Sequence, residues 1–597
     1  MGKLVKIILG FCLVLSISSC GDTASEDGSS KKPLPPEIAN LDAPFFITKD
    51  SLVHPQKLKV AQAYMASKVT LPESTPIEGE WQYAAGNPNL GIKVEISAKP
   101  QQGAPVQLPH LLVQPKMAMW YSKAIDIDLP TVLVVDVDDG AQVYQDGQLI
   151  IPMIDNMYAL ATRKASKIDI RVINNQHQGG LKMASTLSSE QFEEIQNLIT
   201  TDLFIQKLAK QAIAAPTLSE SMANEIVSAI QSGDYEQVQT AARFFLPLLV
   251  NPYIQKPGQT DYAILYERSS FRDLQLDWVD LQSQTPNRFL CELPSTLMCE
   301  TRTRSFEPGI PYKVDITDKR ITETYLISAP SNQLAYTFTA WGSSMAGWDT
   351  FSQLVQKMSE TKDAFTVGLG NLVETSGLKQ PWVNLFDCLQ PISLTTPLYM
   401  AAGPSDYKGF YDEMIVPPFY QYFRNNNYNR TFYSWRATYA AFIVLDPNKN
   451  FPAGIDLEQG QWLEQQLATQ DWQSAQWRFI IINQPPYSQG REGYSGDEQI
   501  REVIDQIAGP TKVDFVLSAY THNFERLTKQ YGDQETTYLV LGGAGAPLEA
   551  APSSAEPVMD KVVKEHHFTR FFMSDGNVRV VTYNQEGDII DEFERSK

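Results

Sequence analysis

The spacing of apolar residues changes character several times along the chain. Apolar and polar positions alternate over residues 45–185, apolar positions recur with a helical period over 186–250, and alternation returns over 251–330. Over 331–597, short continuous apolar runs are separated by amphipathic stretches. Alternation indicates half-buried strands, whereas continuous short runs indicate strands that are buried on both faces. The pattern predicts two strand-rich domains joined by a helical connector and followed by an α/β domain.

Cap signals mark the ends of the predicted connector helices. Ser188 with Gln191, and Thr217 with Glu220, have the spacing of capping boxes. Gly233 is placed to end the second helix, because glycine adopts the left-handed conformation of a C-terminal cap without steric cost. No side chain in this stretch forms a candidate catalytic group, so we expect a structural connector.

The last part of the chain repeats a strand-then-helix rhythm. Amphipathic stretches such as 348–359 and 461–468 stand between several of its apolar runs. This rhythm is typical of a sheet covered by helices. The strand-like runs are 336–340, 365–368, 396–400, 441–445, 479–482, 513–517 and 538–541.

The beginning of the chain has the order of an export signal. Lysines precede the apolar run 7–17, which is too short to span a bilayer and leads into Ser-Ser-Cys20. This ending resembles the lipobox of bacterial lipoproteins, in which the cysteine becomes the lipidated first residue of the mature protein. We expect residues 1–19 to be a signal peptide and 20–44 a flexible tether. The resemblance implies a membrane partner through a lipid anchor, and a cell-envelope location that is periplasmic or faces the outer membrane.

The net charge and the cysteines limit the partners and the metal sites that we expect. The formal net charge of −20 repels phosphate backbones, so nucleic acid is excluded as an expected partner. Cys291 and Cys299 flank a short loop that a disulfide would staple in an oxidising compartment, which leaves Cys388 as a buried free thiol. The sequence has no Cys-x-x-Cys motif or cluster of histidines and cysteines, so we predict no zinc site.

Both strand-rich regions resemble known β-sandwich families. In 45–185, the run 143–147 (Val-Tyr-Gln-Asp-Gly) predicts a tight hairpin and, with 168–174, resembles the galactose-binding-like jelly rolls attached to many glycosidases. That resemblance admits a glycan or protein partner, although such modules often only pack against their neighbours. In 251–330, the stretch 306–314 resembles a strand of the fibronectin type III-like domain that precedes the catalytic domain of purple acid phosphatases.

Short motifs in 331–597 follow the order found in purple acid phosphatases and the wider calcineurin-like metallophosphoesterases. Gly370-Asn-Leu resembles the family's Gly-Asp-Leu, and Gly403-Pro-Ser-Asp resembles its Gly-Asn-His-Asp/Glu. Asn483-Gln-Pro-Pro-Tyr-Ser resembles His-x-Pro-x-Tyr-Ser, and Tyr520-Thr-His-Asn-Phe-Glu-Arg resembles His-x-His-x-Tyr-Glu-Arg. The resemblance implies a four-layer αββα domain over these residues.

That family holds two metal ions with Asp, Asn and His side chains, and with a Tyr in the purple enzymes. Carried over residue by residue, its first Asp, bridging Asp, Tyr and Asn fall on Ser343, Asn371, Glu374 and Pro404. The His near the leaving group, the isolated His and the two histidines of His-x-His fall on Ser405, Asn483, Tyr520 and His522. We call these eight residues the ligand positions. Only His522 keeps the residue of the family.

The substitutions remove the charges that a paired metal centre needs. Two nearby dications repel each other, and a bridging carboxylate offsets that repulsion. Asn371 is neutral, and Pro404 has no side-chain donor atom. We therefore predict no metal cofactor and name no catalytic residue. His522 has two interpretations: a hydrogen bond that holds its turn, or a remaining ligand or acid–base group.

Three functions follow from these observations. The first is a pseudo-phosphoesterase, an exported lipoprotein that keeps the phosphoesterase fold as a binding or scaffold surface. The second is an active phosphomonoesterase or phosphodiesterase whose metal ligands are rearranged to Glu374, Asp406 and His522. The third is a surface protein that binds carbohydrate through its jelly roll. Whether the chain is an enzyme depends on the metal, and the first function is the one we predict.

Overall fold

The computed structural model describes a large part of the chain. Described are residues 46–597 other than 48–50, 68, 87–95, 115–116, 138–139, 155, 175–177, 259–260, 271–273, 282–285, 291–296, 304–306, 318–320, 331–332, 408–417, 428–429, 450–453 and 551. The predicted signal peptide and lipidation site at Cys20 lie outside the described residues, as does Cys291. Within the described part, no helix is both long and apolar enough to cross a membrane.

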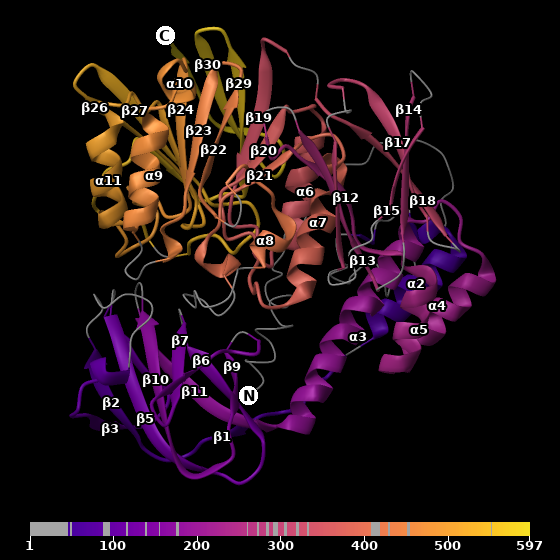
Figure 1. Ribbon diagram of the computed structural model, residues 1–597, viewed down its shortest axis with the longest axis vertical. Helices are drawn as coiled ribbons and strands as arrows, with labels where there is room; N and C mark the ends of the chain where they lie inside the picture. Colours follow the sequence, from indigo (N-terminus) through magenta and orange to yellow (C-terminus); the bar gives the residue numbers. More distant parts are fainter. Residues whose placement is uncertain are drawn as a thin grey trace, which may run out of the picture. The chain divides into compact units, whose positions relative to one another are not determined.

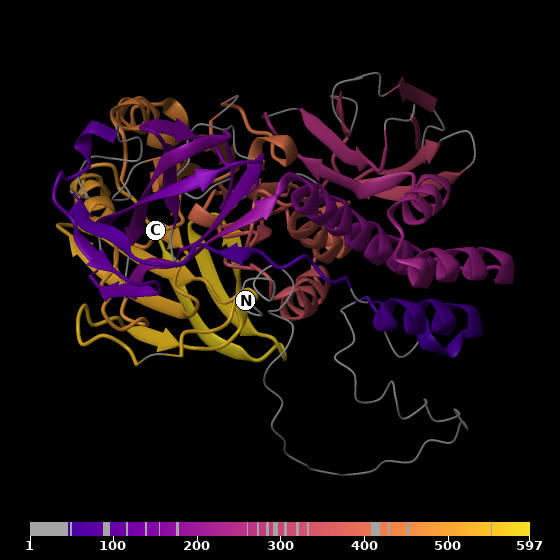
Figure 2. The same cartoon turned by 90° about the horizontal axis from the view of Figure 1, so that it is seen from below.

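A helical unit combines residues before 75 with 191–246. One apolar core holds its helices together, and Figures 1 and 2 show α2 beside the later helices although more than a hundred residues separate them. The sequence assigned 45–74 to the neighbouring strand-rich region, but these residues contribute Val60, Ala61 and Ala63 to the helical core. The helices are α2 (Pro55–Ala66), α3 (Ser189–Ala214), α4 (Glu220–Ser232) and α5 (Tyr235–Phe245), after a short η1 (Ser51–Val53).

The caps of α4 follow the expected chemistry with one shift. The N-cap is Ser219, whose side chain accepts a hydrogen bond from the Met222 backbone, rather than Thr217. Gly233 ends the helix with a φ of 59°, as its position in the sequence predicted.

The first strand-rich region forms two antiparallel sheets around a shared core. At its hairpin, Asp146 and Gly147 have φ values of 50° and 84°, the left-handed conformations that a two-residue turn requires. One sheet contains β1 (Thr75–Pro76), β4 (His110–Val113), β6 (Thr131–Val137), β9 (Met157–Leu160) and β11 (Gln178–Ser188). The other contains β2 (Trp81–Gly86), β3 (Ala104–Val106), β5 (Met117–Ile127), β7 (Ala141–Gln145), β8 (Gln148–Ile150) and β10 (Arg163–Asn174).

The second strand-rich region is also a two-sheet sandwich with a single core. Cys299 is disulfide-bonded, but its expected partner Cys291 lies outside the described residues, so the pairing stays a prediction. One sheet has the order β12 (Leu248–Gln255), β13 (Tyr262–Arg268), β16 (Met298–Thr303). The other has the order β15 (Pro286–Leu290), β14 (Gln275–Asp280), β17 (Pro311–Thr317), β18 (Thr322–Ser328).

Residues 333–597 form the predicted α/β domain, built on two facing sheets. Each sheet has a parallel part, because β19, β20 and β21 run parallel, as do β23, β24, β25 and β27. The first sheet has the order β21 (Leu398–Met400), β20 (Phe365–Gly368), β19 (Tyr336–Trp341), β29 (His567–Ser574), β30 (Asn577–Asn584), β31 (Ile589–Ser596). The second has the order β22 (Tyr433–Ala437), β23 (Ala440–Leu445), β24 (Trp477–Ile482), β25 (Phe515–Ser518), β27 (Gln534–Leu541), β26 (Phe524–Tyr531), β28 (Lys561–Val563).

Helices cover the outer faces of both sheets and complete four layers (Figure 1). On the second sheet, Leu463 and Ile500 pack against the strand residues Ile480 and Val516. On the first sheet, Phe351 contacts Trp341 with ring centroids 4.6 Å apart. The helices are α6 (Trp348–Ser359), α7 (Lys379–Ser393), α8 (Phe419–Tyr422), α9 (Leu457–Leu467), α10 (Gln470–Gln473) and α11 (Glu498–Ala508), with 3₁₀ turns η4 (Pro404–Asp406) and η5 (Pro447–Lys449). Cys388 in α7 is a buried free thiol, as predicted.

Buried polar contacts join the second sandwich to the α/β domain. Glu267 of β13 is fully buried and accepts hydrogen bonds from Lys379 Nζ at 2.8 Å and from the Tyr422 hydroxyl at 3.0 Å. The Tyr253 hydroxyl of β12 donates to the Tyr422 carbonyl oxygen at 2.7 Å. The two regions therefore share a polar interface that excludes water from an acidic side chain.

Candidate functional site

The ligand positions gather beyond the carboxyl ends of the parallel strands. Ser343 follows β19, Asn371 follows β20, and Asn483 follows β24 directly. Tyr520 and His522 follow β25. In α/β folds this edge is where ligands bind, because the loops of neighbouring strands meet there. The fold thus brings to one edge the residues that the motif order selected.

Gly370 is the point at which several of these loops touch. Its carbonyl oxygen accepts a hydrogen bond from the Ser343 amide at 3.0 Å. Asn483 Nδ2 donates to the neighbouring Leu369 carbonyl at 2.7 Å. A Cβ at Gly370 would stand 2.6 Å from the Gly403 nitrogen and 2.7 Å from Asn483 Nδ2, and the residue has a φ of 89°. Only glycine fits this crossing, so the loops are held in one tight arrangement.

The backbone at three ligand positions is left-handed. Ser343, Asn371 and Tyr520 have φ values of 58°, 52° and 70°. Such conformations cost side-chain-bearing residues about 1–3 kcal/mol each and cluster at functional sites. The loops therefore keep a strained geometry of the kind that active sites use, although their side chains carry different chemistry.

Asn371 and Ser405 contact each other directly. The Ser405 hydroxyl donates to Asn371 Oδ1 at 3.2 Å, and the Ser405 amide approaches the same oxygen at 3.4 Å. Pro404 is buried at the start of η4 and offers no donor atom. Asn371, to which the motif order assigns the bridging carboxylate of the family, is a neutral amide whose oxygen already accepts hydrogen bonds from the next loop.

Asp406 holds two loops together through hydrogen bonds to their backbone, and we call this arrangement the Asp406 clasp. Its carboxylate is fully buried and accepts hydrogen bonds from the Gly403 amide at 2.8 Å and from the Leu372 and Val373 amides at 2.8 and 3.2 Å. Burial raises its pKa to about 7, against the lowering effect of these amide donors. The carboxylate ties the loop after β21 to the loop after β20, and its oxygens are occupied by that task.

Glu374 is also engaged by backbone. Its Oε2 accepts a hydrogen bond from the Ala346 amide at 3.1 Å. Burial raises the pKa of this carboxyl group, although its hydrogen bonds act in the opposite direction. Among the residues that the structure describes, no group of three or more His, Cys, Asp or Glu side chains is arranged to hold a metal ion. The alternative ligand set of Glu374, Asp406 and His522 is therefore not assembled.

His522 is bound to a different loop rather than to its own turn. Its Nδ1 lies 2.9 Å from the Pro547 carbonyl oxygen, and its amide donates to Glu549 Oε1 at 3.2 Å. Burial lowers the pKa of the imidazole, and the nearby Arg491 guanidinium lowers it further. The neutral ring, with its Nδ1–H donating to Pro547, serves as a link between loops.

Arg491 and Glu549 are site residues that the sequence did not reveal. Arg491 Nε donates to Glu549 Oε1 at 2.7 Å, and both side chains are largely buried. The guanidinium lies over the Tyr520 ring, 5.4 Å from its centroid. Each is a single charged residue in a loop and belongs to no recognisable motif. The only signal in the sequence is that Arg491 closely follows the Pro-Pro-Tyr-Ser run, which lies at this edge of the sheet.

Two ligand positions keep buried polar atoms without a partner. Ser343 Oγ and Asn483 Oδ1 have no hydrogen-bond partner within the described part of the chain. Both residues are completely buried. Buried polar atoms are normally satisfied, and such exceptions are filled by water or a ligand. The edge therefore presents hydrogen-bonding groups and one compensated ion pair.

Comparisons with known proteins show which fold the chain resembles. No family model matches the chain. It is 22% identical over 203 residues to purple acid phosphatase 22 of Arabidopsis thaliana, which covers 33% of this chain and 44% of that protein. It is 24% identical over 234 residues to "Probable inactive purple acid phosphatase 1" of the same plant, which covers 34% of this chain and 38% of that protein. The matches span less than half the length of either relative.

A solved structure adds a comparison in three dimensions. The purple acid phosphatase from yellow lupin (Lupinus luteus) seeds aligns with a TM-score of 0.49 at 13% identity, covering 80% of this chain and 92% of that one. The sequence matches, together with the two facing sheets, identify a purple acid phosphatase-like metallophosphoesterase fold. This confirms the fold predicted for the last part of the chain.

Proposed function

We propose that this protein is a pseudo-phosphoesterase, which keeps the fold of a metallophosphoesterase as a binding or scaffold surface and has lost hydrolysis. The observation that carries the proposal is the chemistry of the ligand positions. Six of them are Ser, Asn, Pro or Tyr, none of which is charged near neutral pH. One of the relatives reported above is itself named "Probable inactive purple acid phosphatase 1".

The donor set does not fit a pair of divalent ions. A dinuclear centre needs anionic oxygens to offset the repulsion between the ions. Here the bridging position is Asn371, whose oxygen is hydrogen-bonded to Ser405. The orphaned atoms Ser343 Oγ and Asn483 Oδ1 are neutral, so neither adds the negative charge that two divalent ions need. We therefore derive no catalytic step for this chain.

An active enzyme with rearranged ligands is disfavoured by the same contacts. Asp406 would have to release three backbone amides in order to bind metal. Each buried amide left without a partner costs about 1–3 kcal/mol, which a metal site would have to recover. Glu374 and His522 are likewise held by backbone groups. These carboxylates and this imidazole stabilise loops.

The position of the chain in the cell belongs to the same proposal. A lipidated Cys20 would hold the protein at a membrane of the cell envelope, and its partner would be a protein or glycan at that surface. The strand order of the second sandwich, three strands facing four, supports a fibronectin type III-like domain. The two antiparallel sheets of the first sandwich support a galactose-binding-like jelly roll.

Metal analysis with a hydrolysis assay tests the proposal. We expect purified protein to contain far less than one iron, zinc or manganese per chain, and to hydrolyse aryl phosphate mono- and diesters no faster than its Tyr520→Ala variant. A variant that combines Asn371→Asp, Asn483→His and Tyr520→His is the matched gain-of-ligand control, and it should retain more metal than the wild type. Two metals per wild-type chain, with turnover that Tyr520→Ala abolishes, would overturn the proposal.

A further inference from the structure

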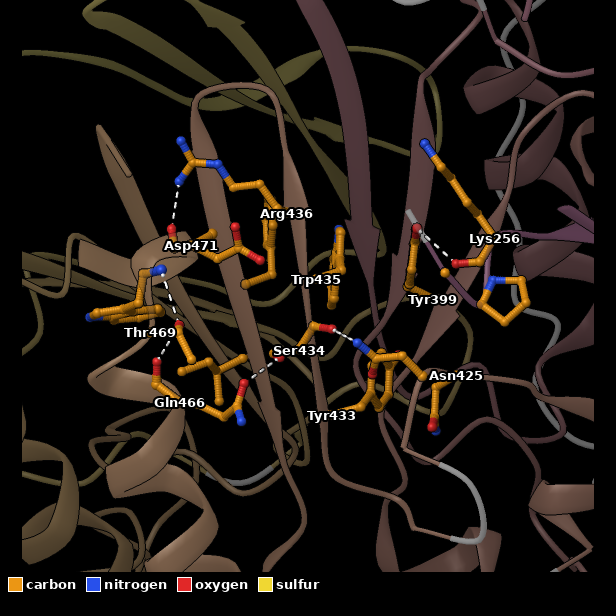
Figure 3. A pocket seen from close by; sticks show the side chains of 17 residues that line it. Lys256, Tyr399, Asn425, Tyr433, Ser434, Trp435, Arg436, Gln466, Thr469 and Asp471 are labelled. Atoms are coloured by element: carbon orange, nitrogen blue, oxygen red, sulfur yellow. Dashed lines mark hydrogen bonds between the residues drawn. The ribbon is translucent and has the colours of Figure 1, made fainter. Parts of the chain in front are cut away.

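A cavity of about 90 Å³ lies beside β22, the edge strand of the second sheet of the α/β domain (Figure 3). Its walls come from this strand, from β21 and from the loop after β12 of the second sandwich. None of the eight ligand positions lines it. It is therefore separate from the site described above.

The alternation of side chains along β22 divides the lining into two sides. Ser434 and Arg436 face one way, where Ser434 Oγ donates to Gln466 Oε1 at 2.9 Å and Arg436 Nη1 donates to the Asp471 carbonyl oxygen at 2.8 Å. The polar groups on that side are occupied by α9 and α10. Figure 3 shows Arg436 and Asp471 on one side of Trp435, with Lys256 and Tyr399 on the other.

The second side is a rigid aromatic wall with one open donor. The Trp435 ring is stacked between the rings of Tyr399 and Phe442. Its centroid lies 4.2 Å from that of Tyr399 and 4.5 Å from that of Phe442, with interplanar angles of 5° and 4°. Both ring faces are covered, so the edge of the indole is what remains for a ligand. Its Nε1–H is buried and has no hydrogen-bond partner in the described residues. A buried N–H donor without a partner costs about 1–3 kcal/mol, which a bound acceptor would recover.

Lys256, in the loop after β12, supplies a cation to the lining of the same cavity. Its carbonyl oxygen accepts a hydrogen bond from the Tyr399 hydroxyl at 3.2 Å, which fixes its backbone against the aromatic wall. Its ammonium lies 5.5 Å from the centre of the Tyr262 ring and forms no ion pair with any residue that the structure describes. Burial lowers the pKa of this ammonium.

We propose that this cavity binds a small oxyanion, a phosphate or carboxylate group, between Lys256 Nζ and Trp435 Nε1. Both groups are donors only, so they select an acceptor, and the ammonium selects a negative one. The cavity of about 90 Å³ has room for an ion of the size of phosphate or acetate.

Calorimetric titration of the full mature chain tests this site. Sodium phosphate and sodium acetate are the probes, each at constant ionic strength, and comparing them distinguishes the two oxyanion classes. Lys256→Gln should weaken binding of the preferred ion about tenfold to a hundredfold, the value of one charge-assisted hydrogen bond. Trp435→Phe, which keeps the ring and removes the N–H, should weaken it about threefold to tenfold. Lys362→Gln, an exposed lysine away from the cavity, controls for net charge and should bind like the wild type.

Thermal melting of each variant establishes that it is folded, so a loss of binding reports on the site. A wild type that binds neither ion would overturn the proposal. Equal affinity in all variants would also overturn it, because binding would then be a general effect of charge. Loss of binding in Arg491→Gln alone would place the anion at the ligand positions instead.

Discussion

Several strands of the α/β domain contribute side chains to the core between the two sheets, and the loop that follows each of them contributes to the ligand positions. The two regions lie only a few residues apart in sequence, yet their side chains differ in polarity. Between the sheets, the rings of phenylalanines on neighbouring strands stack on one another. The ring centroid of Phe479 lies 4.7 Å from that of Phe442 and 4.8 Å from that of Phe515. Beyond the strand ends, most of the ligand positions are polar, and Ser343 Oγ and Asn483 Oδ1 are buried there without a hydrogen-bond partner among the described residues. The interior is filled by packed apolar rings, whereas the edge is lined by hydrogen-bonding groups.

This difference shows that stability and chemistry reside in separate residues of the same strands. The core depends on apolar volume, which the strand interiors keep. Hydrolysis in the family depends on the residues that follow each strand, and these can change without disturbing the packing. A chain can therefore retain the fold while its site takes on other contacts, such as the Asp406 clasp and the Arg491–Glu549 pair.

Truncating the core should have the largest effect. Phe479→Ala removes a fully buried ring between two stacked neighbours, and we expect the free energy of unfolding to fall by about 3–5 kcal/mol. Denaturant unfolding followed by circular dichroism measures the change. Leu457→Ala, at a side chain of the same domain that is 78% exposed, is the control and should change stability by less than about 0.5 kcal/mol. A similar loss in both variants would contradict the contrast.

Acid should destabilise the protein through His567, which is fully buried next to the strand ends. Burial lowers its pKa from 6.5 to about 4, so the unfolded chain binds more protons than the folded one between these values. Stability should therefore fall as the pH drops from 6.5 to 4, with His567 contributing about 3 kcal/mol. Unfolding at several pH values, compared with His567→Gln, isolates this contribution. Identical pH dependence in both proteins would contradict it.

Breaking the clasp should cost somewhat less. Asp406→Asn places an amide N–H₂ where the backbone donors of two loops converge, so at least one buried amide loses its acceptor. We expect a loss of about 2 kcal/mol, measured by denaturant unfolding at neutral pH. Asp533→Asn makes the same change at an exposed turn and should be nearly silent. If Asp406 were instead a free ligand, its replacement would leave stability unchanged.

The smallest effect should come from an orphaned hydroxyl. Ser343→Ala removes a buried oxygen that has no hydrogen-bond partner among the residues the structure describes, so stability should stay within about 0.5 kcal/mol of the wild type or rise slightly. Ser488→Ala is the matched buried serine, because its hydroxyl donates to Glu525 at 2.7 Å, and it should lose about 1–3 kcal/mol. The ranking of the two melting temperatures decides the outcome, and a larger loss at Ser343 would show that its hydroxyl is engaged.

Sequence predicted best where a short motif follows a strand. Gly370 and Asn483 mark loop positions that need a particular backbone or place in the fold, so their order survives substitution. Long-range contacts left no such trace: the packing of α2 against α4 and the burial of Arg491 against Glu549 each join residues far apart in sequence. Asp406 was a candidate metal ligand because the sequence shows a carboxylate within a motif but does not show which hydrogen bonds its oxygens accept.

The buried glutamate between the second sandwich and the α/β domain limits how the protein can be divided for expression. A fragment cut near residue 330 would keep Glu267 and lose both Lys379 and the Tyr422 hydroxyl. The other fragment would expose Phe386, which Tyr253 now covers with ring centroids 4.4 Å apart. Attempts to crystallise or assay either piece should therefore start from a chain that contains both.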